Sequence, residues 1–234
     1  MTTSNLIKKA FNFFKKQNKN NKVSLKTVTH YPKTIENHYE KYIGKADFIW
    51  HEIVMLDPHI DIFSFPPTKK RPFRLLVTAG VSSKKMPVPH SQLPHFIEVI
   101  WTIEEKLYQK HKKSLVNYLK SIARYPHDQN TWIGYSHSLE NKDKKPYFPK
   151  INNKHAATLL MMGDFSGNLE KNFYTELFIK KSRVIFLTPI PITKQQLKLK
   201  LKHDTDFLMK KIWNKLPKVK NKKTFSLIYD GSVY

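Results

Sequence analysis

The chain has 234 residues, of which 40% are hydrophobic, and its 42 lysines and arginines against 18 acids give a formal net charge of +24. This length and composition predict one globular unit with tails. The sequence contains no cysteine, which excludes disulfides, thiol catalysis and cysteine-ligated zinc and favours a cytoplasmic location. It has no run of about 18 apolar residues, so we expect no transmembrane segment.

The positive charge is concentrated at the two ends of the chain. Residues 1–26 hold seven lysines and no acid, and residues 181–223 hold thirteen lysines or arginines against Asp204 and Asp206. Such a field attracts nucleic acid, an anionic membrane or an acidic protein, although solvated lysines without a partner would give the same pattern. Nucleic acid bound through the lysine-rich ends therefore stays open as an alternative function.

Residues 1–30 are predicted to form a basic extension. Within it, residues 6–14 have the pattern of a short amphipathic helix, and residues 15–26 that of a linker. We place the folded domain at residues 31–216 and a second basic extension at residues 217–234.

The first helix of the domain is expected to begin with Thr34 as its N-cap and to end at Gly44. A short strand is predicted at residues 53–56. Two longer apolar runs follow, residues 60–65 and 73–79, joined by the loop PPTKKRP. Their β-branched and aromatic content predicts a hairpin, which the flanking prolines terminate.

The middle of the domain combines a strand, a helix and a turn. Residues 96–103 alternate in the manner of a strand, with the odd-numbered face apolar throughout and expected to be buried. An amphipathic helix is predicted over residues 104–124 and is expected to end because of Pro126. A turn and a strand around residues 132–137 come next, before an exposed lysine-rich loop at residues 139–154.

Two further strands are expected at residues 156–162 and 183–192. Pro189 and Pro191 predict that the second of them ends at a sheet edge or outside the ladder.

Thr193 and Gln196 have the spacing of a capping box and predict one long helix that ends before Pro217. The last apolar segment, residues 224–229, is either an edge strand or a tail.

His59 and Asp61 are two residues apart on a predicted strand, so their side chains point to the same face. With His51 and Glu52 just before them, they are candidates for a metal site or for catalysis. No array of His or carboxylate pairs completes such a site. The favoured interpretation is a His–Asp hydrogen bond that rigidifies the strand, or a polar pair that lines a partner groove.

A second polar cluster follows the long helix. His127 and Asp128 are candidates for an acid/base pair, but neighbouring residues seldom serve each other in this way, and no GxSxG nucleophile motif is present. We favour a structural interpretation, in which Trp132 is core, Tyr125-Pro126 forms the turn and His127 bonds backbone. The sequence also has no P-loop and no GxGxxG, so no nucleotide and no other cofactor is predicted.

Taken in chain order, the motifs HIDI, PPT, RP, LVTAG, MPVP, ARYPH and TWIGYSH resemble those of the Suppressor of fused family. The resemblance extends from Ile35 to Trp213 and implies an α/β (α+β) fold, a mixed sheet flanked by helices. It implies a set of residues that either bind the partner or are landmarks of the family motifs: His59, Asp61, Pro66, Pro67, Thr68, Arg71, Pro72, Thr78, Gly80, Arg124, Tyr125, Pro126, His127, Thr131, Trp132 and His137.

The same resemblance implies a binding role without catalysis. In animals the family member is a cytoplasmic regulator that clasps a peptide segment of a transcription factor against a sheet. Similar bacterial domains are expected to act as immunity proteins against a toxin encoded beside them. The expected mode is strand addition. An inhibitor of a nuclease would usually be acidic, so a charge of +24 favours an acidic toxin as the protein partner.

Overall fold

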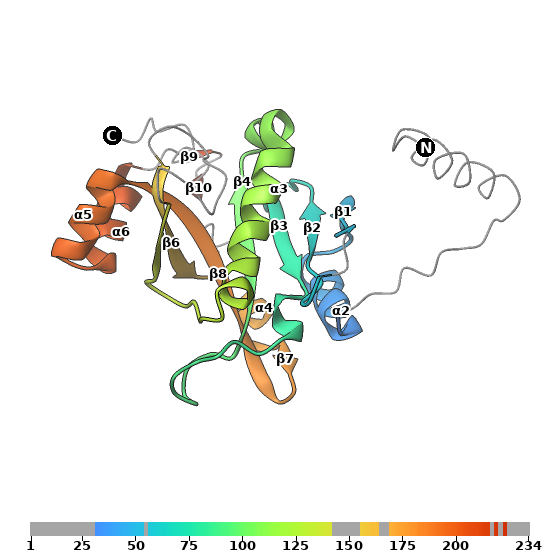
Figure 1. The fold of residues 1–234 in the computed structure, drawn as a ribbon. Helices are drawn as coiled ribbons and strands as arrows, with labels where there is room; N and C mark the ends of the chain where they lie inside the picture. Colours follow the sequence, from blue (N-terminus) through green and yellow to red (C-terminus); the bar gives the residue numbers. More distant parts are fainter. Residues whose placement is uncertain are drawn as a thin grey trace, which may run out of the picture.

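A mixed eight-stranded sheet forms the centre of the computed structural model, with the strand order β1-β2-β3-β4-β8-β6-β5 and with β7 paired to β8 (Figure 1). Neighbouring strands are antiparallel except for β4 and β8, which are parallel. The strands are β1 (Phe48–Trp50), β2 (Asp61–Phe65), β3 (Arg74–Ala79), β4 (Phe96–Ile103), β5 (Ser138–Glu140), β6 (His155–Met162), β7 (Phe178–Ile179) and β8 (Ser182–Thr193). A separate antiparallel pair consists of β9 (Lys218–Val219) and β10 (Lys222–Lys223). This arrangement confirms the predicted α+β fold.

The structure describes residues 31–53, 56–141, 155–163, 169–215, 218–219 and 222–223. The amphipathic segment and linker expected before Tyr31, most of the lysine-rich loop and the last apolar segment lie outside these residues. The predicted boundaries of the two basic extensions therefore stay predictions.

Helices cover both faces of the sheet. They are α2 (Lys33–Tyr42), α3 (Glu105–Asp128), α4 (Lys171–Thr175), α5 (Lys194–Lys202) and α6 (Thr205–Lys215), together with the 3₁₀ turn η1 (Val81–Ser83). The long helix α3 packs on one face of the sheet, α2 and α4 on the other, and α5 and α6 over β6 and β8 (Figure 1). No helix in the described part of the chain is long and apolar enough to cross a membrane.

The predicted hairpin is confirmed as β2 and β3, and its alternation is as expected. Ile60 and Ile62 belong to the core under α3, whereas Phe63 and Phe65 belong to the core under α2. Every residue of β2, β3 and β4 is buried, because helices cover both faces at this point. The apolar face predicted for residues 96–103 is thus buried, and so is the opposite one.

The short strand expected at residues 53–56 is wrong, and the strand lies earlier, at β1. Ile53 is 98% exposed and sits in a bend, while residues 54–55 lie outside the described part. The chain leaves the ladder here because the N–H of Glu52 donates to the Asp61 carboxylate instead of to a neighbouring strand.

Two helix ends differ from the predictions. Helix α2 begins at Lys33 after Pro32, so Thr34 is not its N-cap, but Gly44 follows the C-cap with φ +103° as expected. Helix α3 continues through Pro126 to Asp128. Proline lacks a backbone N–H, so in the last turn of the helix it removes only one backbone hydrogen bond and is tolerated.

The predicted strand at residues 132–137 is also wrong. These residues form a turn in which Ser136 has φ +69°, and the strand that follows is β5. The N–H of Ser136 donates to the Leu160 carbonyl (2.8 Å), so the turn is nevertheless tied to β6. Leu139 is buried within β5 and does not belong to the expected exposed loop.

Pro189 and Pro191 lie inside the ladder with β6, not outside it. They fit because β8 pairs with β4 only as far as Leu187. Beyond that residue β8 has one strand neighbour, and the side without a ladder can take the proline rings.

The capping box of Thr193 and Gln196 is confirmed, but the single long helix is wrong. The chain breaks at His203–Asp204 into α5 and α6. The break is stabilised by the Asp204 carboxylate, which accepts the N–H of Phe207 (2.7 Å) as an N-cap does.

The two-residue turn between β7 and β8 consists of Lys180 and Lys181, with φ +49° and +66°. Such a turn prefers Asn-Gly, because other side chains pay about 1–2 kcal/mol for a left-handed backbone. We therefore expect Lys180→Asn combined with Lys181→Gly to raise the free energy of unfolding by about 2 kcal/mol in urea denaturation. Lys180→Gln with Lys181→Gln removes the same charge and should give no such gain. Equal stabilities of the two double variants would contradict the explanation.

Candidate protein-binding edge of the sheet

Strand β1 forms one end of the sheet. It pairs with β2, and no other strand of the described chain pairs with its outer side. Phe48 is 53% exposed, and its ring meets the half-buried Trp50 ring edge to face, with the centroids 4.9 Å apart. The edge therefore offers backbone N–H and C=O groups beside aromatic surface, the combination to which an extended peptide can add.

The start of β1 is held by a buried arginine. Arg74 is 5% exposed, and its Nη1 donates to both carboxylate oxygens of Asp47 (2.9 and 2.7 Å). Its Nε and Nη2 donate to the two oxygens of Glu105 (2.7 and 3.0 Å). Bidentate pairs of this kind are the strongest charge-assisted hydrogen bonds, so β1 begins at a defined position.

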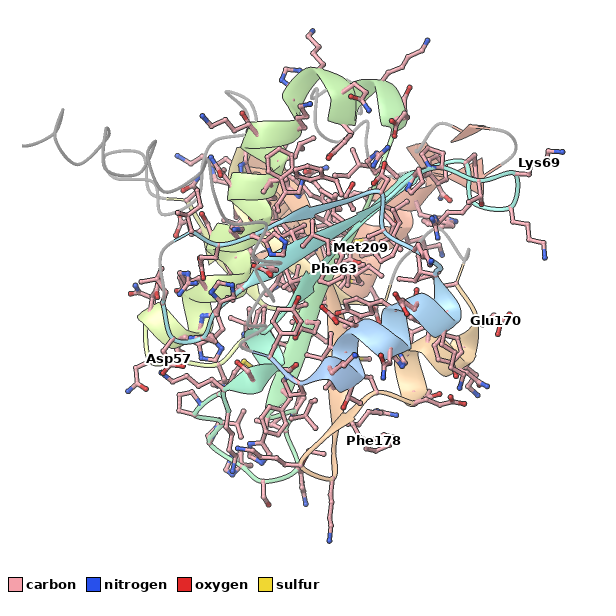
Figure 2. All side chains as sticks on the ribbon, turned by 90° about the vertical axis from the view of Figure 1, so that its right-hand side faces the viewer. Asp57, Phe63, Lys69, Glu170, Phe178 and Met209 are labelled. Carbon is pink, nitrogen blue, oxygen red and sulfur yellow. The ribbon has the colours of Figure 1, made fainter. Side chains whose placement is uncertain are left out.

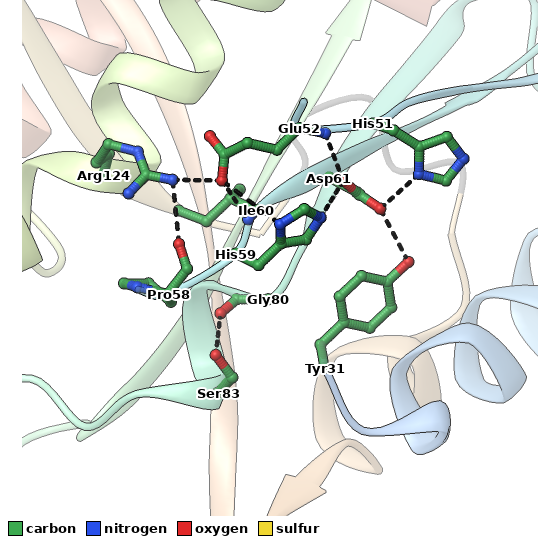
Figure 3. Close-up of polar contacts among 10 residues, drawn as sticks. All are labelled: Tyr31, His51, Glu52, Pro58, His59, Ile60, Asp61, Gly80, Ser83 and Arg124. Carbon is green, nitrogen blue, oxygen red and sulfur yellow. Dashed lines mark hydrogen bonds and ion pairs between the residues drawn. The ribbon is translucent and has the colours of Figure 1, made fainter. Parts of the chain in front are cut away.

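The end of β1 is held by Asp61, which is 2% exposed (Figure 3). Its Oδ1 accepts the N–H of Glu52 (2.9 Å) and lies 3.0 Å from Nε2 of His59. Its Oδ2 accepts from Nδ1 of His51 (2.8 Å) and from the Tyr31 hydroxyl (3.4 Å). Burial, together with the negative charge of Asp61, raises the pKa of Tyr31, which keeps this hydroxyl a donor.

Glu52 joins the two motif clusters into one network. Its Oε2 accepts the N–H of Ile60 (3.0 Å) and Nη2 of Arg124 (2.6 Å), and the same Nη2 donates to the Pro58 carbonyl (3.0 Å) (Figure 3). The predicted His59–Asp61 contact is confirmed. Glu52 was considered only beside His51 as part of a possible metal or catalytic site, and its role in closing this network was not predicted. No sequence spacing reveals it, since 72 positions separate Glu52 from Arg124.

The PPT and RP motifs close the β2–β3 loop on itself. The Thr68 hydroxyl accepts the N–H of Arg71 (2.9 Å), the Thr68 N–H donates to the Arg71 carbonyl (2.6 Å), and Nη2 of Arg71 donates to the Pro66 carbonyl (2.9 Å). Pro67 and Pro72 are half-buried in the same loop. Lys69 of this loop and Asp57, near the Asp61 network, lie on opposite sides of the molecule (Figure 2). The structure therefore does not bring these motif residues to the network.

Thr78 and Gly80 surround a buried carboxylate that was not predicted as a site, Glu98 of β4. One of its oxygens accepts the Thr78 hydroxyl (2.6 Å), and the other accepts the Gly80 N–H (3.1 Å) and both the N–H and hydroxyl of Ser82 (3.0 and 2.6 Å). Burial raises the pKa of Glu98 to about 7. The hydrogen bonds that the carboxylate accepts lower the pKa, but their effect is smaller than that of burial. The LVTAG motif thus builds a turn around this side chain.

The last turn of α3 and the residues after it make structural contacts. The predicted turn at Tyr125-Pro126 is wrong, because both residues lie inside α3. Nε2 of His127 donates to the Val81 carbonyl (3.2 Å), which confirms the predicted backbone bond. Burial lowers the pKa of His127, so its neutral form is favoured. The Trp132 and His137 rings meet edge to face at 4.3 Å, and Trp132 is half-buried against the core under α3, where Tyr125 also packs. The N–H of Thr131 donates to the carbonyl of Pro126 (2.9 Å).

Within the described ranges, no group of three or more His, Asp or Glu side chains could hold a metal ion. The carboxylates of Asp61 and Glu52 accept hydrogen bonds and ion pairs instead. The metal-site alternative therefore has no support from these residues.

Two cavities flank β1, one on each face of the sheet. The cavity on the α3 side has a volume of about 260 Å³ and is lined by Phe48, Trp50, Arg74, Tyr108, Gln109 and Lys112 among others. The cavity on the α2 side has a volume of about 400 Å³ and is lined by Glu36, Tyr39, Glu40, Ile49, Phe63 and Phe65 among others. Successive side chains of a strand point to opposite faces, so a strand added to β1 would direct alternate side chains into the two cavities.

Solved structures of similar fold were found, at low sequence identity. The crystal structure of the Sufu–Fu complex matches with a TM-score of 0.51 at 10% identity, covering 76% of this chain and 80% of that one. A Suppressor of fused homologue from Neisseria gonorrhoeae FA 1090 matches with a TM-score of 0.49 at 14% identity, covering 79% and 89%. Drosophila Suppressor of Fused matches with a TM-score of 0.43 at 11% identity, covering 65% and 38%. At 10% identity, the match to the Sufu–Fu complex shows a shared fold.

The sequence itself carries the family assignment. No curated protein matches the chain. The family model described as Suppressor of fused protein (SUFU) matches residues 57–221, which include the Asp61 network from His59 onward and all the predicted motifs. The chain belongs to the Suppressor of fused family.

Proposed function

We propose that the protein is a non-enzymatic protein-binding module that takes an extended segment of its partner as an added strand along β1. One observation carries this proposal: the open edge of β1 has a cavity on each face, so that strand pairing and side-chain recognition occur together. Two ionic networks, around Arg74 and Asp61, hold the edge in place before a partner arrives. Such preorganisation reduces the entropy cost of binding.

We further propose that the partner is a toxin that the protein neutralises in the cytoplasm, as an immunity or antitoxin protein. The resemblance to bacterial domains of this family supports such a role, and the net charge of +24 supports an acidic toxin. A solved relative was crystallised as a complex, the Sufu–Fu complex, which supports a binding role.

The test is a pull-down from the native cell with the full chain at two salt concentrations, identifying both protein and nucleic acid. A stoichiometric protein that persists at high salt supports the proposal. Nucleic acid alone, lost as salt rises, would favour the alternative, binding through the lysine-rich ends, because each phosphate contact releases a counterion.

An edge variant connects such a partner to β1. We expect Phe48→Lys to weaken its binding at least about tenfold, because a lysine on an edge strand opposes strand addition. Phe178→Lys is the matched control, since Phe178 is 50% exposed on β7, whereas Phe48 is 53% exposed. Figure 1 shows β7 and β1 in separate parts of the sheet. Equal binding by both variants, measured by calorimetry, would place the interface elsewhere.

A further inference from the structure

The structure assigns a chemistry to the bound strand: we infer that it carries a lysine or arginine whose side chain enters the α2-side cavity, adjacent in sequence to an apolar residue that enters the α3-side cavity. This inference rests on the proposed function and names the kind of peptide that β1 would select. It is argued from the walls of the two cavities.

The α2-side cavity has an aromatic wall and an acidic rim. Phe63 and Phe65 stack with centroids 6.4 Å apart, and Tyr39 meets both rings edge to face at 5.7 and 6.4 Å. Glu36 and Glu40 also line the cavity, and they lie on one side of α2 because four residues separate them.

This combination suits a long cationic side chain. The methylenes of lysine or arginine can lie along the rings while the charged group reaches the carboxylates. Lys45 lines the same cavity, so the two carboxylates outnumber the one cation, and a second cation can pair with the remaining carboxylate. The Tyr31 hydroxyl, whose one proton is shared between Asp61 (3.4 Å) and Glu36 (3.3 Å), holds the Glu36 carboxylate near the rim.

The α3-side cavity has the opposite preference. Its walls include the rings of Phe48, Trp50 and Tyr108. The charge of Arg74 is already matched by Asp47 and Glu105, and Lys112 at the same cavity opposes a further cation. An apolar or aromatic side chain is therefore the better occupant of this cavity.

Together the cavities determine the register of the peptide. Neighbouring residues of a strand point to opposite faces, so an apolar–basic pair in sequence satisfies both cavities at once. A slip by one residue would bring the basic side chain against Lys112 and the apolar one against Glu36 and Glu40. The mismatch therefore disfavours the wrong register, in addition to the match that favours the right one.

The experiment is a selection of displayed random peptides, long enough to span β1, on the full-length protein. We expect the selected peptides to share an apolar–basic pair and to bind, as synthetic peptides, about tenfold more weakly to Glu36→Gln/Glu40→Gln. The control, Glu140→Gln/Glu170→Gln, removes two exposed acids elsewhere and should bind as the unmodified protein does. Glu40→Lys should restore affinity for a peptide whose basic residue is changed to glutamate.

The outcomes separate the two proposals. Peptides whose binding is lost in Phe48→Lys but which lack a basic residue would overturn the inference and leave strand addition at β1 intact. Selected peptides with an acidic residue in place of the basic one would also overturn the inference. The net positive charge of the protein, and not the two glutamates of the α2-side cavity, would then determine which peptides bind. A failure to select any peptide that depends on Phe48 would count against strand addition at β1 itself.

Discussion

Replacing Gly80 with alanine should lower the free energy of unfolding by roughly 4 kcal/mol, a large effect for the addition of one methyl group. Gly80 has φ +116°, a backbone conformation that side chains rarely adopt. A Cβ built there would lie 2.0 Å from the His59 carbonyl oxygen, which belongs to the backbone and cannot turn aside. Urea denaturation followed by circular dichroism would measure the loss.

Gly44→Ala is the control for this prediction. Gly44 has φ +103°, but a Cβ there would meet nothing within 4 Å. Only the backbone strain remains, so we expect a loss of about 1–2 kcal/mol. If both variants lose the same amount, the contact with the His59 carbonyl is not what makes glycine necessary at position 80.

The second large effect is a pH dependence that Glu98 imposes on stability. The pKa of this carboxyl is about 7 in the folded protein, against an ordinary value of 4.5 for an exposed glutamate, mainly because of its burial. The folded state therefore binds the proton more tightly than the unfolded state. Proton binding by Glu98 therefore stabilises the folded state fully below pH 4.5. This contribution to the free energy of unfolding declines as the pH rises to about 7 and is absent above that. The shift corresponds to roughly 3 kcal/mol.

Glu98→Gln should remove this dependence. The amide oxygen can still accept from Gly80 and Ser82, and the NH₂ group can donate to Thr78, whose hydroxyl then turns to the Val99 carbonyl 3.4 Å away. We expect the stability difference, wild type minus variant, to fall by roughly 3 kcal/mol between pH 4.5 and 7 in urea titrations. All other groups titrate alike in both proteins and cancel. A difference that is constant across this range would contradict the prediction.

Several residues of the family motifs make buried structural contacts in this chain. Asp61, Glu52 and Arg124 hold the end of β1, and Gly80 and Thr78 form the turn around Glu98. The residues that line the two cavities come from α2, β1, α3, β2, β3 and the connection between α2 and β1, and none of them belongs to the quoted motifs. The motif residues and the residues that line the proposed binding edge are thus different sets, because a buried network can orient an edge without lining it.

Elements that depend on local periodicity and on hydrogen bonds between near neighbours could be predicted from the amino-acid sequence. The alternation in β2 and β4, the capping box at Thr193 and the glycine after α2 could be predicted, since each depends on neighbours within a few residues. Where a residue at a distance supplied the partner, prediction failed: Glu52 gives its N–H to Asp61 and so ends β1 early, and β6 anchors the turn that was expected to be a strand.

The candidate binding edge depends on contacts between segments that are far apart in the chain. The two cavities bring α2, α3 and β1 together, and Arg74 meets Asp47 and Glu105 across 27 and 31 positions. Such contacts are set by how helices pack on the two faces of the sheet, and no spacing in the sequence encodes them. The chain therefore identified its family through short motifs, whereas the edge that we propose for binding became visible through packing alone.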